Sequence, residues 1–406
     1  MAIERLALGD PAQVAAAVRA MAPGAASVAD AVAGIVADVR ARGDAALSEY
    51  VERFDDVRGP LRVEADELRG ALDDLDPSVR AGLEVAIANV REVAVAGRDD
   101  EREVLLPAGQ VIRLREVPVR RAAIYVPGGR APYPSTVVMG VVTARAAGVG
   151  EVVVCAPGAH PVILAACALC EADAVFRMGG AHAVAALAYG TTSVPRADVI
   201  AGPGNLYVQE AKRLVSGDVG IDGFAGPSDL LVLAADGADP ALVALDLAAQ
   251  AEHGEGTIVC AVSDDPALLD AIAFDPGQAA AALVDAPDLE AALDFVEAFA
   301  PEHLELIGPE AEQLAPRVRS AGCVFVGPES ATAFGDYVAG SNHTLPTGGA
   351  ARFASGLSPR HFRRRMSEVR IGPAADALAR AGAPLARAEG FERHAASMEV
   401  RENPAP

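Results

Sequence analysis

The pattern of hydrophobic and polar residues changes near residue 120. Before it, residues 10–100 are predicted to be helical, with helix starts at Asp10-Pro11 and Asp76-Pro77. After it, short β-rich runs alternate with helical segments. The β-rich runs are 122–126, 151–156, 174–178, 198–201, 229–234, 257–262, 304–307 and 323–326. Alternation of strands and helices at these lengths predicts parallel sheets with crossover helices.

Two such α/β blocks are predicted, and they meet near residues 225–240. The C-terminal segment is expected to be helical, first Arg-rich over 361–366 and then Ala-rich. Residues 152–170 carry no acidic or basic side chain, yet Pro157 and Pro161 interrupt them. That stretch indicates a strand, a turn and a helix start, not a membrane span. The crossover helices are expected at 135–147, 161–171, 181–189, 206–214 and 240–253.

Length, charge and cysteine content narrow the class of protein. The 406 residues give room for two or three domains. A formal net charge of −22 argues against nucleic acid or an anionic membrane surface as a partner. The five cysteines are odd in number and mostly flanked by apolar residues, so we expect a reducing, cytoplasmic location. Cys167, Cys170 and Cys260 are interpreted as core residues.

The histidines point to chemistry, because four of the seven lie in short stretches rich in Gln, Asp, Glu and Gly. These stretches are Gln250 to His253, Glu302-His303, Asp336 to His343, and Glu389 to His394. Imidazoles beside carboxylates and amides are typical of a divalent metal site with a proton-transfer pair. One reaction centre assembled from distant segments is therefore predicted.

Each stretch also has a simpler explanation. Gln250 and His253 share a helix face near a C-terminus that favours cations, but alone they fit a solvated last turn better. Glu302 and His303 offer two bases for two proton transfers, or an ordinary surface junction between helix and strand. Glu389 and His394 are five positions apart and do not share a helix face cleanly, so that pair alone fits a solvated C-terminal helix.

The segment 335–347 is too rich in glycine and polar residues for a helix or a core strand. We expect a shaped loop in which Asp336 binds a ligand and Asn342 or His343 forms hydrogen bonds, with a long surface turn as the alternative. The density of functional side chains favours a functional loop.

Glycine and proline turns suggest where a ligand would approach the backbone. Gly202-Pro203-Gly204 matches only the first two glycines of the dinucleotide-binding fingerprint, because Tyr207 replaces the third. Gly179-Gly180 forms a second turn that enters a helix. The Pro/Gly segments 125–135 and 225–229 fit simple turns, or the mouth of a site at the carboxyl ends of strands.

Taken in order, the segments of this chain resemble the histidinol dehydrogenase family over essentially its whole length. Each segment is weakly specific, but the ordered set is very specific. The segments are YVPGGRAPYPS, MGGAHAVAALAYGT, AGPGNLYVQEAKR, AGPSDLL, DLAAQAEHG, APEHLEL, GDYVAGSNHTLPT and AEGFERHA.

The resemblance implies two related Rossmann-like parallel-sheet domains of α/β class, one inserted in the other, with small helical N- and C-terminal segments. The first domain is expected over 15–124 and 235–358, and the second, on the cofactor side, over 125–234. The N-terminal segment covers 1–14, and a C-terminal arm covers 359–406.

The resemblance also implies oxidation of L-histidinol to L-histidine through L-histidinal, with zinc and two NAD reductions, as the last step of histidine biosynthesis. It assigns proton transfer to Glu302 and His303, and the cofactor to Tyr125, His182 and Asn205. It implies a homodimer whose C-terminal arm reaches the partner's site. The zinc ligands are assigned to Gln250, His253, Asp336 and His394, which also contact substrate together with Ser228, His303, His343 and Glu389.

Two residues depart from the family pattern. His182 stands where glutamine is usual, and Asp229 where glutamate is usual. Two other functions are considered: a relative that oxidises another small polar alcohol, and an inactive metal-binding homologue. The retained Ser228, His343 and Glu389 argue for histidinol, and the intact proton-transfer pair argues for activity.

Overall fold

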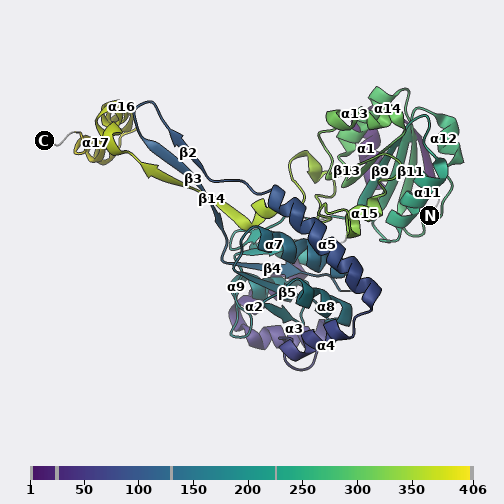
Figure 1. Cartoon of the computed structure of the whole chain (residues 1–406), viewed down its shortest axis with the longest axis horizontal. Coiled ribbons are helices and arrows are strands. Elements are labelled where there is room, and N and C mark those ends of the chain that lie inside the picture. The colour runs from purple at the N-terminus through teal and green to yellow at the C-terminus, as the bar shows by residue number, and fades with distance from the viewer. Residues whose placement is uncertain (1–2, 23–26, 129–130, 225, 403–406) are drawn as a thin grey trace. The chain divides into compact units, whose positions relative to one another are not determined.

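The protein forms two compact units, Met1–Gly97 with Val119–Phe362, and Arg98–Pro118 with Arg363–Pro406. The structure, a computed structural model, describes residues 3–22, 27–128, 131–224 and 226–402. Its strands form three sheets, two in the first unit and one in the second (Figure 1).

The first sheet of unit 1 has six parallel strands in the order β1-β11-β10-β9-β12-β13. Alternate residues of its strands enter two separate cores: Leu231 and Leu233 in one, Leu230 and Val232 in the other. Burial on both faces explains why these strands are continuous apolar runs. The strands are β1 (Ile3–Ala7), β9 (Asp229–Ala234), β10 (Ile258–Ser263), β11 (Ala280–Asp285), β12 (His303–Ile307) and β13 (Cys323–Val326). The accompanying helices are α1 (Pro11–Ala20), α11 (Pro240–Ala251), α12 (Pro266–Ala271), α13 (Leu289–Phe299), α14 (Pro309–Glu312) and α15 (Thr332–Tyr337).

The second sheet of unit 1 has five parallel strands in the order β6-β5-β4-β7-β8. They are β4 (Arg121–Tyr125), β5 (Glu151–Cys155), β6 (Ala174–Phe176), β7 (Val199–Ala201) and β8 (Gly220–Ile221). The helices that follow its strands are α6 (Pro134–Val137), α7 (Thr143–Ala146), α8 (Pro161–Leu169), α9 (Gly180–Tyr189) and α10 (Leu206–Val215), with a π-helical turn at Val138–Val142 between the first two. The N-terminal helices are α2 (Ala29–Arg42), α3 (Asp44–Phe54), α4 (Ala65–Asp73) and α5 (Pro77–Ala96).

These N-terminal helices pack on the five-stranded sheet. Val36 of α2 shares a core with Ala123 of β4, and Ile87 of α5 shares the opposite core with Ile124. Strand β9 belongs to the other sheet. We predicted that 15–124 joins 235–358 in one domain and that 229–234 lies in the cofactor-side domain. The packing instead places the N-terminal helices on the five-stranded sheet and β9 in the six-stranded sheet. A helix's hydrophobic pattern reveals that one face is buried, but not which sheet covers it.

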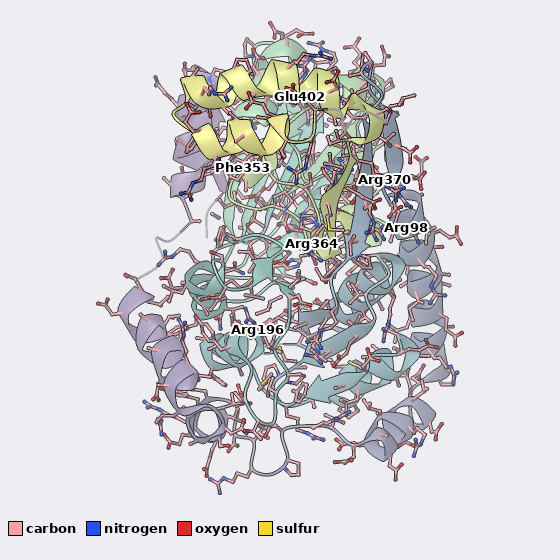
Figure 2. All side chains as sticks on the ribbon, turned by 90° about the vertical axis from the view of Figure 1, so that its left-hand side faces the viewer. Arg98, Arg196, Phe353, Arg364, Arg370 and Glu402 are labelled. Carbon is pink, nitrogen blue, oxygen red and sulfur yellow. The ribbon has the colours of Figure 1, made fainter. Side chains whose placement is uncertain are left out.

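Unit 2 is a three-stranded antiparallel sheet, β14-β3-β2, followed by a pair of helices. Its strands are β2 (Arg102–Leu105), β3 (Val111–Pro118) and β14 (Arg363–Arg370), and its helices are α16 (Ala375–Ala388) and α17 (Glu392–Glu399). The exposed Arg364 and Arg370 lie along β14 (Figure 2). Short 3-10 turns occur at Ala315–Arg317, Ala350–Arg352, Pro359–Phe362 and Gly372–Ala374.

All eight strands predicted from the sequence are confirmed, but two terminal predictions were wrong. Residues 3–7, expected in a helical segment, form strand β1, which completes the sheet edge beside β11. The Arg-rich segment 361–366, expected to be helical, mostly enters strand β14, which pairs along its whole length with β3. Pairing with a distant strand, which local sequence does not encode, decides both cases.

The apolar segments behave as expected. Cys167 and Cys260 are completely buried in separate cores, and all five cysteines are free thiols. No helix within the described residues is long and apolar enough to cross a membrane.

A buried glutamate ties the six-stranded sheet to helix α15. Glu305 of β12 accepts hydrogen bonds at Oε1 from the Thr332 N–H (2.8 Å) and the Thr332 hydroxyl (2.6 Å). Its other oxygen, Oε2, is buried and has no hydrogen-bond partner among the described residues. Burial, followed by the nearby charge of Asp246, raises the pKa of Glu305 to about 7. Ionised Glu305 therefore costs stability in the folded state.

We expect Glu305→Gln to remove part of the pH dependence of stability. The folded pKa lies above the usual value near 4.5, so this residue lowers the free energy of unfolding as pH rises from about 4.5 to about 7. The loss amounts to about 3 kcal/mol at most. Urea unfolding at pH 5 and pH 8 should show a smaller difference in the variant, because glutamine keeps the oxygen that faces Thr332 but cannot ionise. The exposed Glu310→Gln is the matched control, and equal pH slopes in all three proteins would contradict this account.

Candidate functional site

Three of the predicted site residues form a continuous hydrogen-bond chain in unit 1. The Gln250 side-chain amide donates to the Ser228 hydroxyl oxygen (2.6 Å), and that hydroxyl donates to Glu302 Oε2 (2.6 Å). Gln250 lies in the last turn of α11, Ser228 immediately precedes β9, and Glu302 immediately precedes β12. Segments separated by up to 74 residues are thus joined at one point.

Two reciprocal hydrogen bonds join Asp229 and Glu302 at this point. The Asp229 N–H donates to Glu302 Oε2 (3.0 Å), and the Glu302 N–H donates to Asp229 Oδ1 (2.7 Å). Arg19 of α1 donates to the other Asp229 oxygen (3.2 Å). Burial raises the pKa of Asp229, and burial with the neighbouring Asp229 charge raises the pKa of Glu302 well above its usual range. The pair therefore favours holding a proton.

His303 begins β12 beside this pair. Its Nδ1–H donates to the Asp229 carbonyl oxygen (3.2 Å), and its Nε2 faces Asp336 Oδ1 at 3.8 Å. Burial lowers the pKa of His303 to about 4, against the opposing effect of the Asp336 charge. The ring is therefore neutral at pH 7, with a lone pair at Nε2 that can accept a proton.

Two further histidines are oriented by backbone carbonyls. His253 Nδ1 donates to the Gln250 carbonyl (3.0 Å), and His343 Nδ1 donates to the Asp336 carbonyl (2.9 Å). This leaves Nε2 of each ring for a ligand, although His343 Nε2 also lies 3.5 Å from the Thr136 hydroxyl. Burial lowers the pKa of His343, so its ring is also neutral. Hydrogen bonds of this kind fix the tautomer of metal-binding or substrate-binding imidazoles.

Unit 1 supplies three donors that suit a zinc ion: the side-chain carbonyl of Gln250, His253 Nε2 and the Asp336 carboxylate. Only two of these come from His, Cys, Asp or Glu side chains. Across the parts of the chain that the structure describes, no three such side chains are grouped closely enough to hold a metal. Glu389, at the C-terminus of α16, and His394, in α17, belong to unit 2, where both are exposed.

Two details of this site differ from the sequence-based expectation. Asp336 lies in the short helix α15, not in a loop, because Glu305 binds the first residue of that helix. The segment 225–229, of which residue 225 lies outside the described residues, was predicted to form either a simple turn or the mouth of a site at the carboxyl ends of strands. Ser228 and His303 instead lie at the amino-terminal edge of the six-stranded sheet, where β9 and β12 begin. A turn's composition does not reveal which end of a strand it adjoins.

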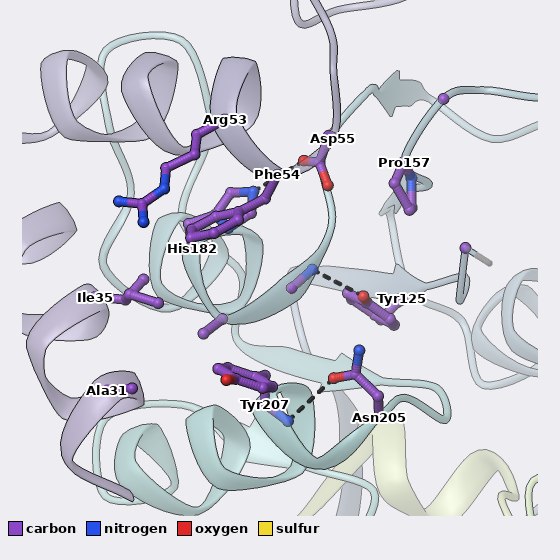
Figure 3. A pocket seen from close by; sticks show the side chains of 14 residues that line it. Ala31, Ile35, Arg53, Phe54, Asp55, Tyr125, Pro157, His182, Asn205 and Tyr207 are labelled. Atoms are coloured by element: carbon purple, nitrogen blue, oxygen red, sulfur yellow. Dashed lines mark hydrogen bonds and ion pairs between the residues drawn. The ribbon is translucent and has the colours of Figure 1, made fainter. Parts of the chain in front are cut away.

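A separate cavity of about 810 Å³ opens at the carboxyl ends of strands β4 to β7 (Figure 3). All three residues expected to bind cofactor, Tyr125, His182 and Asn205, line it. Asn205 caps α10 by accepting from the Tyr207 N–H (3.0 Å) and the Val208 N–H (3.2 Å). The Tyr125 hydroxyl accepts from the Gly180 N–H (2.9 Å), and burial raises the pKa of Tyr125. The carboxyl ends of parallel strands are where dinucleotides bind in such folds.

A buried carboxylate holds each glycine turn of this cavity. Asp55 accepts from the Gly179 N–H (2.9 Å) and from His182 Nε2 (2.9 Å). Asp222 accepts from the Gly202 N–H (2.7 Å), and it forms a buried ion pair with Lys212.

Sequence reasoning did not identify Asp55 or Asp222, because a single acidic residue carries no spacing signal. The one available signal was Lys212, the only lysine in the chain. Its side chain is buried, and a buried lysine needs an anionic partner.

Two aromatic side chains surround His182, and one of them, Phe54, also lines the cavity. The His182 ring is 6.0 Å, centroid to centroid, from both Tyr50 and Phe54. The imidazole is nearly fully buried and is bound to Asp55. It shares the Asp55 carboxylate with the Gly179 N–H and so connects helix α9 to the residue that follows α3. A glutamine amide, which is usual at this position by resemblance, has a donor group for the same carboxylate.

Comparisons with known proteins agree along the whole chain. The family model described as histidinol dehydrogenase matches residues 19–402. A histidinol dehydrogenase from Nocardia farcinica is 46% identical over 401 residues, covering 90% of this chain and 89% of the relative. One from Parasynechococcus marenigrum is 44% identical over 390 residues, covering 90% and 89%.

A solved structure agrees as well. The crystal structure of histidinol dehydrogenase from Elizabethkingia anophelis is 28% identical, covers 98% of both chains and superimposes with a TM-score of 0.92. Family model, relatives and fold extend over both the residues of the hydrogen-bond chain and those of the cavity. This chain belongs to the histidinol dehydrogenase family.

Proposed function

We propose that this protein oxidises L-histidinol to L-histidine through L-histidinal, reducing two NAD molecules, as the last step of histidine biosynthesis. Family membership supports the reaction and its cofactor. The observation that carries the proposal is the chain Gln250–Ser228–Glu302, with the neutral His303 beside it. It brings together Glu302, whose raised pKa favours holding a proton, and His303, whose neutral ring can accept one. A two-step oxidation has two separate proton transfers that these groups can serve.

The two groups serve different steps. When the alcohol loses hydride to NAD, its hydroxyl proton must leave, and we assign that proton to Nε2 of His303. The aldehyde must then add water before a second hydride can leave, and we assign activation of that water to Glu302. Its raised pKa makes its carboxylate a stronger base than an exposed glutamate once it is deprotonated.

We assign zinc to Gln250, His253 and Asp336 of one subunit and His394 of its partner. The amide, imidazole and carboxylate donors of unit 1 fit this ion. When bound, zinc would supply a Lewis acid that fixes the amine and imidazole of the substrate. Ser228, His343 and Glu389 are assigned to substrate contacts. His343 suits this role because Nδ1 is already engaged by the Asp336 carbonyl.

The assignment of His394 to the partner's zinc site requires a homodimer. Unit 2 exposes large apolar side chains that a second copy of the chain would cover, namely Leu385 (67% exposed), Phe391 (53%) and Val400 (77%). Exposed groups of this kind are typical of protein interfaces. In a two-fold dimer each arm would complete the partner's site. The five free thiols suit the reducing cytoplasm, where we place the enzyme.

Two other functions remain as alternatives: oxidation of a different small polar alcohol, and metal binding without catalysis. The first would leave the proton-transfer pair intact but would need other substrate contacts than His343 and Glu389. The second would not need the buried Asp229–Glu302 pair, whose two carboxylates are costly to bury without a use. Both are therefore less well supported than histidinol oxidation.

We expect Glu302→Gln to separate the two oxidations. Water activation is needed only in the second step, so oxidation of added L-histidinal should fall by about 100-fold or more. NADH release from L-histidinol should continue as a single oxidation, with aldehyde accumulating. Rapid-quench analysis of both half-reactions measures the split. The exposed Glu255→Gln serves as the matched control, and equal loss of both steps in Glu302→Gln would refute the division of roles.

We expect subunit mixing to restore activity between two inactive variants. Asp336→Ala and His394→Ala should each be nearly inactive alone, because each lacks one zinc ligand in every site. In a mixed dimer one site carries both lesions and the other carries neither. Random mixing makes half of the dimers mixed, so about a quarter of wild-type activity should return. If mass spectrometry confirms subunit exchange and activity stays absent, the arm does not serve the partner.

A further inference from the structure

We propose that Arg53 binds a phosphate group on the adenosine half of the cofactor. This inference rests on the NAD-dependent activity proposed above. Arg53 lies in the last turn of α3 and lines the 810 Å³ cavity together with Tyr125, His182 and Asn205. No role has been assigned to it by motif or by resemblance.

The glycine turns of this cavity have few backbone donors left for a phosphate. In dinucleotide-binding folds, the N–H groups of such turns and of the following helix normally meet the pyrophosphate. Here the N–H groups of Gly179, Gly180 and Gly202 donate to Asp55, Tyr125 and Asp222. At the start of α10 the Tyr207 and Val208 N–H groups donate to Asn205.

At the start of α9, two N–H groups remain without a backbone acceptor among the described residues. The N–H groups of Ala181 and His182 precede Ala183, the first residue to bond back to Gly179. The backbone donors that remain in these turns are neutral, so they give little compensation for the charge of a dinucleotide. A further cationic group is therefore needed to hold its phosphates.

Arg53 is the one arginine or lysine among the described residues that line the cavity. Its guanidinium lies 5.0 Å from the centroid of the Phe54 ring, and within the described parts of the chain it forms no ion pair. Figure 3 shows the side chain extending into the cavity on the same side as Ile35 and Ala31. The protein has a net charge of −22, so most of its surface repels anions. An arginine without a carboxylate partner in the cofactor cavity attracts an anion to that position.

The neighbours of Arg53 indicate which half of the cofactor it meets. Ala31, Ile35, Phe54 and Tyr207 give that end of the cavity apolar and aromatic walls, which suit an adenine base. The opposite side carries Tyr125 and Pro157 (Figure 3). We therefore place the adenosine at the Arg53 end.

Two phosphates could occupy this position. The 5′-phosphate is present in both NAD and NADP, whereas a 2′-phosphate is present only in NADP. Many NAD sites exclude the 2′-phosphate with a free carboxylate that binds the ribose. The only carboxylate among the described lining residues, Asp55, is already engaged by Gly179 and His182. The two sources must therefore be separated by experiment.

The test is direct binding to the zinc-loaded enzyme, measured by isothermal titration calorimetry with adenosine, AMP and 2′,5′-ADP. We expect Arg53→Met to weaken AMP about 10-fold and to leave adenosine unchanged, because the lost interaction is a charge-assisted hydrogen bond. Arg53→Lys should recover most of the affinity, since it keeps the charge. The affinity of Arg53→Met for AMP should also depend less on salt than that of the wild type.

The ligands distinguish every outcome. A loss with AMP assigns the 5′-phosphate, and a loss confined to 2′,5′-ADP assigns the 2′-phosphate. An equal loss with adenosine would mean that Arg53 only shapes the cavity, and no loss with any ligand would also overturn the proposal. Because these ligands do not react, a failure to oxidise histidinol would refute the proposed function without altering this result.

Discussion

The candidate site depends on the reciprocal hydrogen bonds between Asp229 and Glu302. Each residue's backbone N–H binds the other's carboxylate, so the starts of β9 and β12 are fixed to one another. Ser228 and His303 adjoin this pair in sequence and take their positions from it. The same contact costs energy, because burial raises the pKa of both carboxyl groups and the Asp229 charge raises that of Glu302 further. Arg19 offsets part of that cost by binding Asp229.

The two sheets of unit 1 use opposite edges. The side chains that we assign to catalysis lie where strands of the six-stranded sheet begin, whereas the cavity opens where strands of the five-stranded sheet end. In both places a buried acidic residue accepts backbone N–H groups and holds a turn in one conformation. Asp55 and Asp222 do this for the glycine turns, as Asp229 and Glu302 do for the segments that carry Ser228 and His303. Rigid turns of this kind hold functional groups in place before a ligand arrives.

Much of the fold could be predicted because buried parallel strands are continuous apolar runs, as in β5 and β10. Strand β11, Ala-Ala-Ala-Leu-Val-Asp, was missed because alanine favours helices over strands. The composition around the histidines predicted that the stretches with Gln250, Glu302 and His303 meet in one reaction centre. Each motif alone also fits an ordinary turn or junction, and only the ordered resemblance assigned a role to each residue. Asp55 and Asp222 were not predictable, because their partners lie 124 and 20 residues away and no local pattern links them.

The central claim is that one site carries an alcohol through an aldehyde to an acid. Its most direct measurement is the number of NADH molecules formed per molecule of L-histidinol, with substrate limiting and NAD in excess. The account predicts two NADH and one L-histidine for each L-histidinol consumed. One NADH with free L-histidinal as the final product, or none at all, would contradict it.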